Sequence, residues 1–201
     1  MALKIRIQQF WNYLKKDSWH SWVVSLILIV VLIRFIFFPT LSFITASPLP
    51  LVVVESCSMY HESGFEMWWT KNAEWYKTNG ISEEEFMTFR LRNGFTKGDI
   101  IVVWGRSSYI VGDVIVFEAN PEANARHPII HRIVTTDPIA TKGDHNPGQL
   151  VGNTNNQNID ETNILPERIM GKAIIKIPLL GWIKLIFFEP FREAAQRGFC
   201  R

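Results

Sequence analysis

The segment LVVVESCSM, residues 51–59, joins a run of apolar residues to a polar cluster. Its first four residues are apolar, three of them are valines, and such a run predicts a short buried strand. The polar cluster then lies at the end of that strand. Because alternate side chains of an extended backbone share a face, Ser56 and Ser58 are expected on one side and Cys57 on the other.

Four further segments are rich in Val and Ile, and turn residues such as Gly98 and Gly112 separate several of them. These predicted strands cover residues 99–104, 113–118, 129–134 and 169–177. No long amphipathic helix alternates with them, which argues against a parallel α/β sheet. The pattern therefore predicts a mainly β domain with an antiparallel sheet over residues 45–176.

Residues 61–96 interrupt this pattern and predict a small helical insertion. Ser82 stands three residues before Glu85, the spacing of a helix-start capping box. Upstream, an aromatic stretch contains Trp68 and Trp69. Aromatic clusters usually pack as core, so we interpret this one as a satellite hydrophobic cluster on the β domain. The alternative is a surface that meets lipid headgroups or a partner, where Trp and Tyr are also favoured.

The segment WVVSLILIVVLIRFIFF, residues 22–38, is long and apolar enough to span a bilayer as a helix. Pro39 is expected to end that helix. Four basic residues precede the segment, and none follows it before Lys71. This asymmetry predicts a single-pass signal anchor in the cell membrane, with residues 1–21 cytoplasmic and the β domain extracytoplasmic.

A cleaved signal peptide is the alternative, since residues 45–47 are small. The long segment before the apolar run and the length of the run itself favour the anchor. Near the other end of the chain, residues 177–188 are apolar but too few, and too interrupted by Pro and Gly, to span a bilayer. Residues 177–201 are therefore predicted to be an interfacial segment, more favourably helical than a closing strand.

The composition excludes several functional classes. With 21 Lys and Arg against 19 Asp and Glu, the net charge of +2 is too balanced for a nucleic-acid-binding surface. Two cysteines, Cys57 and Cys200, cannot by themselves make a disulfide framework or a four-thiolate zinc site. His127 and His131 have a spacing that would suit a metal on a helix, but Pro128 argues against that helix. No metal or cofactor is expected.

Three clusters carry groups that could act together in catalysis. The first holds Ser56 and Ser58, the second is His131 inside an apolar strand segment, and the third is Asp144 in a glycine turn. Serine hydrolysis of an acyl bond needs a hydroxyl, a base and an acid that fixes the imidazole tautomer. Taken singly, each residue is more ordinarily a turn serine, a core histidine or a loop carboxylate.

Together, however, the motifs resemble those of a known family. The runs VESCSM (54–59), GDVIVF (112–117), IHRIV (130–134) and TKGDHN (141–146) occur in the order seen in type I signal peptidases. The resemblance is to the archaeal and endoplasmic-reticulum branch, in which histidine replaces the lysine base. It covers most of residues 20–185, including the apolar segment.

The resemblance implies a role for each matched residue. Ser58 would be the nucleophile and His131 its general base, while Asp144 would orient His131 or buttress the site. Ser56 would help to hold the oxyanion. This branch often has a second acid six residues after the Gly-Asp pair, where this chain has Leu150. Asp160 or Glu161 could return to the site instead, and Asp160 is the weakly preferred candidate.

The function implied is removal of signal peptides from exported preproteins by a membrane-anchored serine endopeptidase, alone or with further membrane subunits. Because neutral His131 must accept a proton, activity should fall in acid. The substrate is expected to lie extended beside the predicted first strand. One alternative is a catalytically silent anchored domain that binds exported or cell-surface proteins, and another is a protease of the same fold with one dedicated precursor. The expected substrate-binding residues are Leu51, Val52, Val53 and Val54.

Overall fold

The computed structural model describes residues 2–125, 127–152, 157–193 and 196–200. Part of the asparagine-rich tract, residues 153–156, and parts of the predicted C-terminal interfacial segment lie outside this description. The chain divides into two compact units, Met1–Ile44 and Thr45–Arg201, each of which is described by itself. The second unit contains both the β domain and the C-terminal segment.

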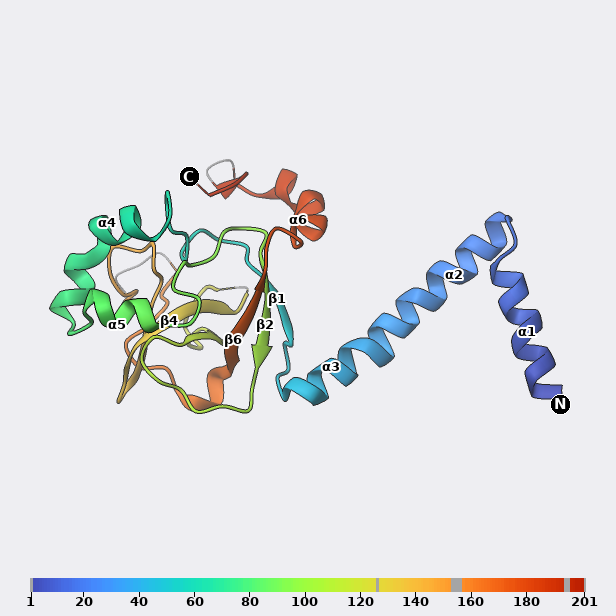
Figure 1. Ribbon diagram of the computed structural model, residues 1–201, viewed down its shortest axis with the longest axis horizontal. Coiled ribbons are helices and arrows are strands. Elements are labelled where there is room, and N and C mark those ends of the chain that lie inside the picture. The colour runs from blue at the N-terminus through green and yellow to red at the C-terminus, as the bar shows by residue number, and fades with distance from the viewer. Residues whose placement is uncertain (1, 126, 153–156, 194–195, 201) are drawn as a thin grey trace. The chain divides into compact units, whose positions relative to one another are not determined.

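The N-terminal unit is helical (Figure 1). From Trp19 to Thr45 the helix is 27 residues long with a mean hydropathy of 2.6, which is long and apolar enough to cross a membrane. Most of its side chains are exposed, so they are not the core of a soluble fold. Its elements are α1 (Ala2–Leu14), α2 (Trp19–Leu32), the π-helical turn η1 (Ile33–Phe37) and α3 (Phe38–Thr45).

The helix does not end at Pro39, where the sequence rule places its end. Pro39 is the second residue of α3, which follows η1 directly. There the Phe38 N–H donates to the Ile33 carbonyl, five residues back. A proline ring clashes with the carbonyl four residues before it, and the wider π turn accommodates that ring without breaking the helix. The apolar helix is therefore longer than residues 22–38.

The second unit is built on one six-stranded sheet with the order β1-β2-β6-β3-β4-β5, and every neighbouring pair is antiparallel. The predicted mainly β, antiparallel class is confirmed. The short strand β5 was not anticipated, because two of its four residues are polar and give no apolar run. The strands are β1 (Leu51–Val53), β2 (Ile100–Trp104), β3 (Val114–Phe117), β4 (Ile129–Thr136), β5 (Ile139–Lys142) and β6 (Ile169–Ile177).

The insertion folds as helices α4 (Phe65–Thr78) and α5 (Glu83–Thr88). The Ser82 hydroxyl accepts the Glu85 N–H at 3.1 Å, as the capping pattern predicts. Trp68 and Trp69 are 1% and 4% exposed, and they pack with α5 and with residues of β4 and β5. The satellite-cluster interpretation is confirmed, and these two indoles are not available to a partner or to lipid.

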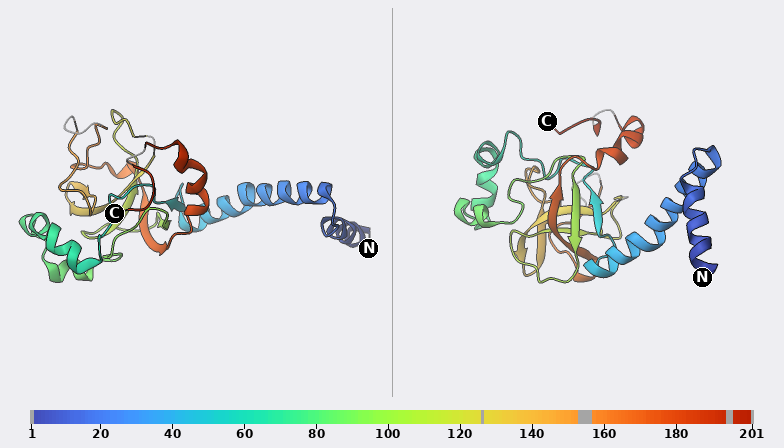
Figure 2. Two further views of the ribbon diagram at one scale, coloured as in Figure 1. Left: turned by 90° about the horizontal axis from the view of Figure 1, so that it is seen from above. Right: turned by 45° about the vertical axis from the view of Figure 1, so that its right-hand side comes forward.

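The insertion and the C-terminal helix lie on opposite sides of the sheet (Figures 1 and 2). The predicted helical form of residues 177–188 holds for α6 (Trp182–Phe188), which follows β6 and is itself followed by the 3-10 turn η3 (Glu189–Phe191). A second 3-10 turn, η2 (Pro166–Arg168), leads into β6. The sheet thus carries β1 and its polar loop at one edge and β5, next to β4, at the other. The loops after β1 and β5 meet beside His131 of β4 at the candidate site.

Candidate active site

The first strand delivers the two serines together. Just after β1 the backbone still pairs with the segment before β2, since the Val54 N–H donates to the Asp99 carbonyl at 2.8 Å. The hydroxyls of Ser56 and Ser58 then lie 3.1 Å apart and are hydrogen-bonded. Cys57 points the other way and forms a disulfide with Cys200. The two serines are therefore together and Cys57 is engaged elsewhere, as expected, but residues 56–59 form a bend and a turn and not the extended backbone from which this was predicted.

His131, in β4, is buried with only 3% of its surface exposed, and its Nδ1 forms a very short contact with Glu161 Oε1. A carboxylate can only accept, so Nδ1 must carry the ring proton, which leaves Nε2 as an acceptor in the neutral ring. Glu161 is fixed in turn by the Thr141 hydroxyl, 3.0 Å from Oε1, and by the Leu150 N–H, 2.7 Å from Oε2. The imidazole is thus held in the tautomer that a general base requires.

The Nε2 atom of His131 faces the loop that carries Ser58, with Gly143 between them. A Cβ built on Gly143 would lie 2.8 Å from His131 Nε2 and 2.9 Å from the Ser58 carbonyl oxygen. Both atoms therefore border the same small space, which is open only because residue 143 has no side chain. Among the described residues no hydrogen bond joins the Ser58 hydroxyl to His131, as is common before substrate binds.

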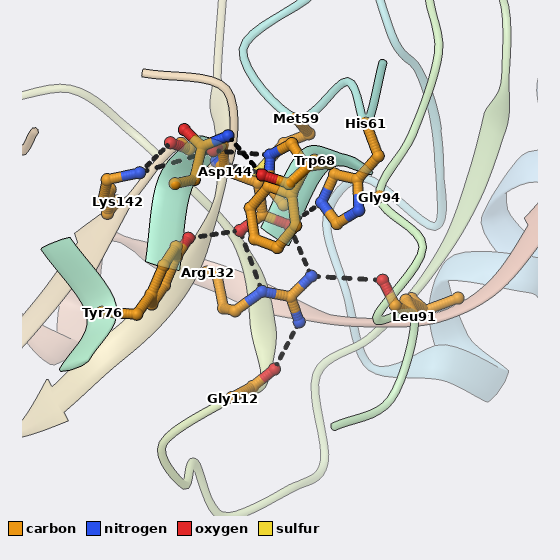
Figure 3. Close-up of polar contacts among 12 residues, drawn as sticks. Met59, His61, Trp68, Tyr76, Leu91, Gly94, Gly112, Arg132, Lys142 and Asp144 are labelled. Atoms are coloured by element: carbon orange, nitrogen blue, oxygen red, sulfur yellow. Dashed lines mark hydrogen bonds and ion pairs between the residues drawn. The ribbon is translucent and has the colours of Figure 1, made fainter. Parts of the chain in front are cut away.

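Asp144 anchors a separate buried network (Figure 3), and among the described residues no hydrogen bond or ion pair joins it to His131. Its Oδ2 lies 2.7 Å from Arg132 Nη2 and 2.9 Å from His61 Nε2. Its Oδ1 accepts from the Tyr76 hydroxyl and from Arg132 Nε, each at 2.9 Å. Arg132 follows His131 in β4, so of the two roles considered for Asp144 this geometry fits the buttressing role and not the orienting one.

The same loop contacts Ser58 and Met59 directly. The His145 N–H donates to the Ser58 carbonyl at 2.8 Å, and the Asp144 N–H approaches Met59 Sδ at 3.3 Å. From the insertion, Trp68 Nε1 donates to the Asp144 carbonyl at 3.1 Å. The helical insertion therefore helps to position the loop that contacts Ser58.

The buried network is held together by charge. Burial alone would raise the pKa of Asp144, but the Arg132 guanidinium and the hydrogen bonds from His61 and Arg132 hold it well below its usual value. Burial lowers the pKa of His61, with Asp144 partly opposing that effect. Burial likewise lowers the pKa of Lys142 to about 8. Among the described residues no group of three or more His, Cys, Asp and Glu could hold a metal ion.

Asp160, the weakly preferred second acid, is directed elsewhere. Its Oδ1 accepts from the Thr162 N–H at 2.9 Å and from the Thr162 hydroxyl at 2.6 Å, which closes a local turn. Glu161 is the acid that reaches His131. An aspartate two residues before a threonine is a known signal for such a self-contained turn, and that spacing could have distinguished the two acids. The partners Arg132, His61 and Tyr76 of Asp144 gave no comparable signal in the sequence.

Strand β1 lies at one end of the sheet order, so one of its edges is unpaired within the sheet. Leu51 pairs with Val102, Val52 with Ile101, and the Val54 N–H donates to Asp99. In an antiparallel pair the residues alternate between bonding the neighbour and facing away. The main-chain groups of Leu51 and Val53 therefore face the open edge. This edge leads straight to Ser56 and Ser58.

The comparisons with known proteins agree with the resemblance seen in the motifs. No protein-family model matches the chain. It is similar to the signal peptidase complex catalytic subunit SEC11 of Colletotrichum graminicola, with 26% identity over 117 residues, which cover 52% of this chain and 63% of that protein. It is also similar to SEC11 of Komagataella phaffii, with 27% identity over 110 residues, 47% of this chain and 60% of that protein.

The chain thus spans less than two thirds of the length of these relatives. Both names belong to the signal peptidases, so the comparisons support the similarity to the endoplasmic-reticulum branch. The antiparallel sheet and the N-terminal apolar helix agree with the fold that this similarity implies.

Proposed function

We propose that this protein is a serine endopeptidase that cleaves signal peptides from exported preproteins. The observation that carries the proposal is the orientation of His131, whose Nδ1 contacts buried Glu161 while its Nε2 borders the same space as the Ser58 carbonyl. A serine, an imidazole and an acid in this relation are the groups that acyl transfer requires. The two relatives, named as catalytic subunits of signal peptidase complexes, supply the substrate class.

In the proposed reaction His131 removes the proton of the Ser58 hydroxyl as that oxygen attacks the scissile carbonyl. The imidazolium that forms is stabilised by Glu161, and it then protonates the leaving amine. The Ser56 hydroxyl and the Ser58 amide are the proposed donors to the oxyanion. Water attacks the acyl-enzyme with His131 again as base, which releases the signal peptide and regenerates Ser58.

The proposed substrate lies extended along the open edge of β1, with main-chain hydrogen bonds to Leu51 and Val53. Adding a strand to a sheet edge gives affinity through backbone groups and leaves selection to shallow side-chain pockets. The scissile bond would then follow the strand direction toward Ser58. The residues proposed to form this binding edge are Leu51, Val52, Val53 and Val54.

The helix Trp19–Thr45 is the proposed membrane anchor, with the N-terminus in the cytoplasm. The basic residues before it support this orientation. The Cys57–Cys200 disulfide supports it independently, because disulfides persist in oxidising, extracytoplasmic compartments. In sealed vesicles with the cytoplasmic side inside, added protease should digest residues 45–201, and protection of that unit would contradict the orientation.

The C-terminal helix is proposed to rest on the bilayer surface. Ile183 and Phe187 of α6 are 68% and 70% exposed, whereas Leu185 is buried. An apolar face next to basic residues such as Lys184 suits a membrane interface. Replacing Ile183 and Phe187 by Asp should lower cleavage of a membrane-held precursor but not of a short soluble peptide, and equal effects on both would contradict the proposal.

Because both relatives are named as subunits of a complex, association of this chain with further membrane subunits is also proposed. Native electrophoresis of a mild detergent extract should then show a particle containing more protein than this 23.3 kDa chain. A particle made of the chain alone would contradict the association without affecting the proposed chemistry.

The central test is cleavage of a precursor with a small residue before the scissile bond by the full-length protein in detergent. Ser58→Ala should abolish cleavage, and His131→Gln should lower it to near background. Ser107→Ala is the matched control, since that hydroxyl donates to the adjacent Ser108 carbonyl and, within the described part of the chain, to no group of the proposed site. Undiminished cleavage by the Ser58 variant would remove the assignment. If the wild type binds the precursor but does not cleave it, the alternative of a catalytically silent domain that binds exported or cell-surface proteins is favoured instead.

A further inference from the structure

The described parts of the C-terminal segment, residues 182–193 and 196–200, are attached to the loop that carries the proposed nucleophile. The disulfide between Cys57 and Cys200 joins residues 143 apart in the sequence, with a Cα–Cα distance of 5.5 Å. Cys57 is the residue between Ser56 and Ser58. The two hydroxyls and the disulfide therefore leave the same three-residue stretch on opposite sides.

A second attachment lies two residues before the disulfide. Glu55 Oε1 is 2.9 Å from Lys184 Nζ, and Glu55 Oε2 is 2.5 Å from Arg192 Nη2. Arg192 Nη1 also donates to the Glu55 carbonyl at 3.1 Å, so it holds main chain as well as side chain. Residues 55 and 57 are thus both tied to the C-terminal segment, while the hydroxyls of residues 56 and 58 bond to each other.

The C-terminal segment is itself bound to the β domain through Lys97, whose side chain is only 1% exposed. Lys97 Nζ lies 2.6 Å from Glu189 Oε1 and donates to the Gln196 carbonyl at 2.6 Å. The Trp182 indole N–H donates to the Lys97 carbonyl at 3.0 Å. A segment held at three places in this way can transmit a fixed position to Cys57.

The loop of residues 55–58, which carries the proposed nucleophile, has few main-chain hydrogen bonds to other parts of the described chain. Residues 55–58 belong to no strand or helix, and their main-chain hydrogen bonds come from a turn, Tyr60 N–H to the Cys57 carbonyl, and from His145. Nucleophilic attack demands placement to within a fraction of an ångström, and loss of that placement can cost about 100-fold in rate. The C-terminal attachments supply the constraint that regular secondary structure does not.

We propose that the Cys57–Cys200 disulfide and the Glu55–Arg192 ion pair are positioning groups that hold Ser56 and Ser58 in the reactive arrangement, so that opening the disulfide lowers catalysis in the folded protein. This inference rests on the proposed function. Opening is an exchange with a dithiol reductant: a thiolate attacks one sulfur and the S–S bond breaks. The second thiol of the reductant then attacks the mixed disulfide, which leaves two protein thiols and an oxidised, cyclic reductant.

The chain offers a clean test because it contains two cysteines and so a single target for the reductant. Cleavage of a precursor peptide by the full-length protein in detergent is measured before and after treatment with dithiothreitol, with free thiols counted by alkylation. We expect kcat to fall about tenfold or more while KM changes less than about twofold. Reoxidation should restore kcat. The Cys57→Ala/Cys200→Ala variant should have the low kcat already and should not respond to the reductant.

If the disulfide were merely structural, its reduction would lower the unfolding temperature but leave kcat unchanged in protein that is still folded. Circular dichroism of the reduced sample therefore accompanies the assay. If reduction unfolds the chain, Arg192→Ala decides instead: it should lower kcat with the disulfide intact, and Arg192→Lys should recover part of the loss. Full kcat in folded, reduced protein overturns the inference but not the proposed function. No cleavage by the oxidised wild type overturns both.

Discussion

The main-chain N–H of Leu150 donates a hydrogen bond to the carboxylate of Glu161, with 2.7 Å between N and Oε2. Leu150 stands at the position where the resembling family often has its second acid. The two segments also pair through the main chain, since the Glu161 N–H donates to the Leu150 carbonyl at 2.8 Å. Glu161 therefore brings a carboxylate to the site eleven residues after Leu150. The main chain of Leu150, which has no acidic side chain itself, holds that carboxylate in place.

This relationship predicts that Glu161 is the orienting acid of the catalytic group. Glu161→Gln keeps the shape of the side chain but can offer an N–H to His131, which favours the wrong tautomer. The equivalent loss in serine triads reaches about 10⁴-fold in kcat, and we expect about 10²- to 10⁴-fold here. Steady-state kinetics on a precursor peptide provide the measurement.

Asp160→Asn is the natural comparison, because the two acids are adjacent and only one contacts the imidazole. Its carboxylate closes a turn with Thr162, and an amide oxygen can accept the same hydrogen bonds. We expect a loss of a few-fold at most. A larger loss for the Asp160 variant than for the Glu161 variant would reverse the assignment of the third residue.

Gly143 is predicted to be required for activity. A Cβ at this position would lie 2.8 Å from His131 Nε2 and 2.7 Å from Asn146 Nδ2, so Gly143→Ala must displace the base or the loop. We expect kcat to fall by at least about 100-fold. Gly148→Ala, in the same loop, is the matched control, since its nearest neighbour is Trp75 Nε1 at 3.6 Å. Comparable kcat for the two variants would show that the space beside Nε2 is not used.

Ser56→Ala tests the proposed oxyanion donor. The hydroxyl of Ser56 lies 3.1 Å from that of Ser58, so it is placed to serve the same reacting group. Removing one donor of this kind costs about 10²- to 10³-fold in kcat, with KM little changed. We expect a weak but measurable enzyme. A raised KM with unchanged kcat would assign Ser56 to substrate binding instead.

Much of the fold could be predicted because its strands are apolar runs bounded by turn residues. The exceptions have physical reasons. Pro39 was expected to end the apolar helix, yet a π turn before it relieves the clash that the rule assumes. Strand β5 has too few apolar residues to be seen, and it is stabilised by pairing with β4.

The candidate site was predictable in kind but not in detail. Serine, histidine and acid motifs point to the proposed chemistry, whereas the acid that reaches His131 depends on how the chain returns after residue 150. That return is set by main-chain pairing between Thr141, Leu150 and Glu161, which no local pattern encodes. The disulfide between Cys57 and Cys200 likewise depends on the tertiary fold, since 143 residues separate the two cysteines.

The Asp144 network predicts how stability depends on pH. The folded pKa of Asp144 is depressed, so its contribution is present above the ordinary value of 3.8 and is lost as the pH falls through the folded pKa. His61 also has a lowered pKa, so the unfolded chain gains a proton below about pH 6.5 that the folded chain resists. Both effects reduce stability on acidification, which denaturant unfolding at pH 7, 5 and 3 measures.

Asp144→Asn should remove the lowest-pH part of that dependence and destabilise the protein by about 3–5 kcal/mol at pH 7, because Arg132 is left buried without its counterion. Glu62→Gln breaks an exposed ion pair with Lys71 and should barely move the unfolding midpoint. An Asp144 variant as stable as wild type would mean that the buried pair does not support the loop beside Ser58.

The last prediction concerns the open edge of β1. The main-chain groups of Val52 face β2, whereas those of Val53 face the open edge. The Val53 N–H faces the unpaired edge, so Val53→Pro removes a donor that only an added strand would use, and edge positions of this kind tolerate proline. We expect KM for an extended precursor peptide to rise about tenfold while the unfolding midpoint changes little, the size of one lost hydrogen bond. Val53→Thr keeps both shape and N–H and should behave like wild type. Val52→Pro instead breaks a hydrogen bond to β2 and should destabilise the fold. If the Val53→Pro variant binds the peptide as well as Val53→Thr does, the substrate does not pair with this edge.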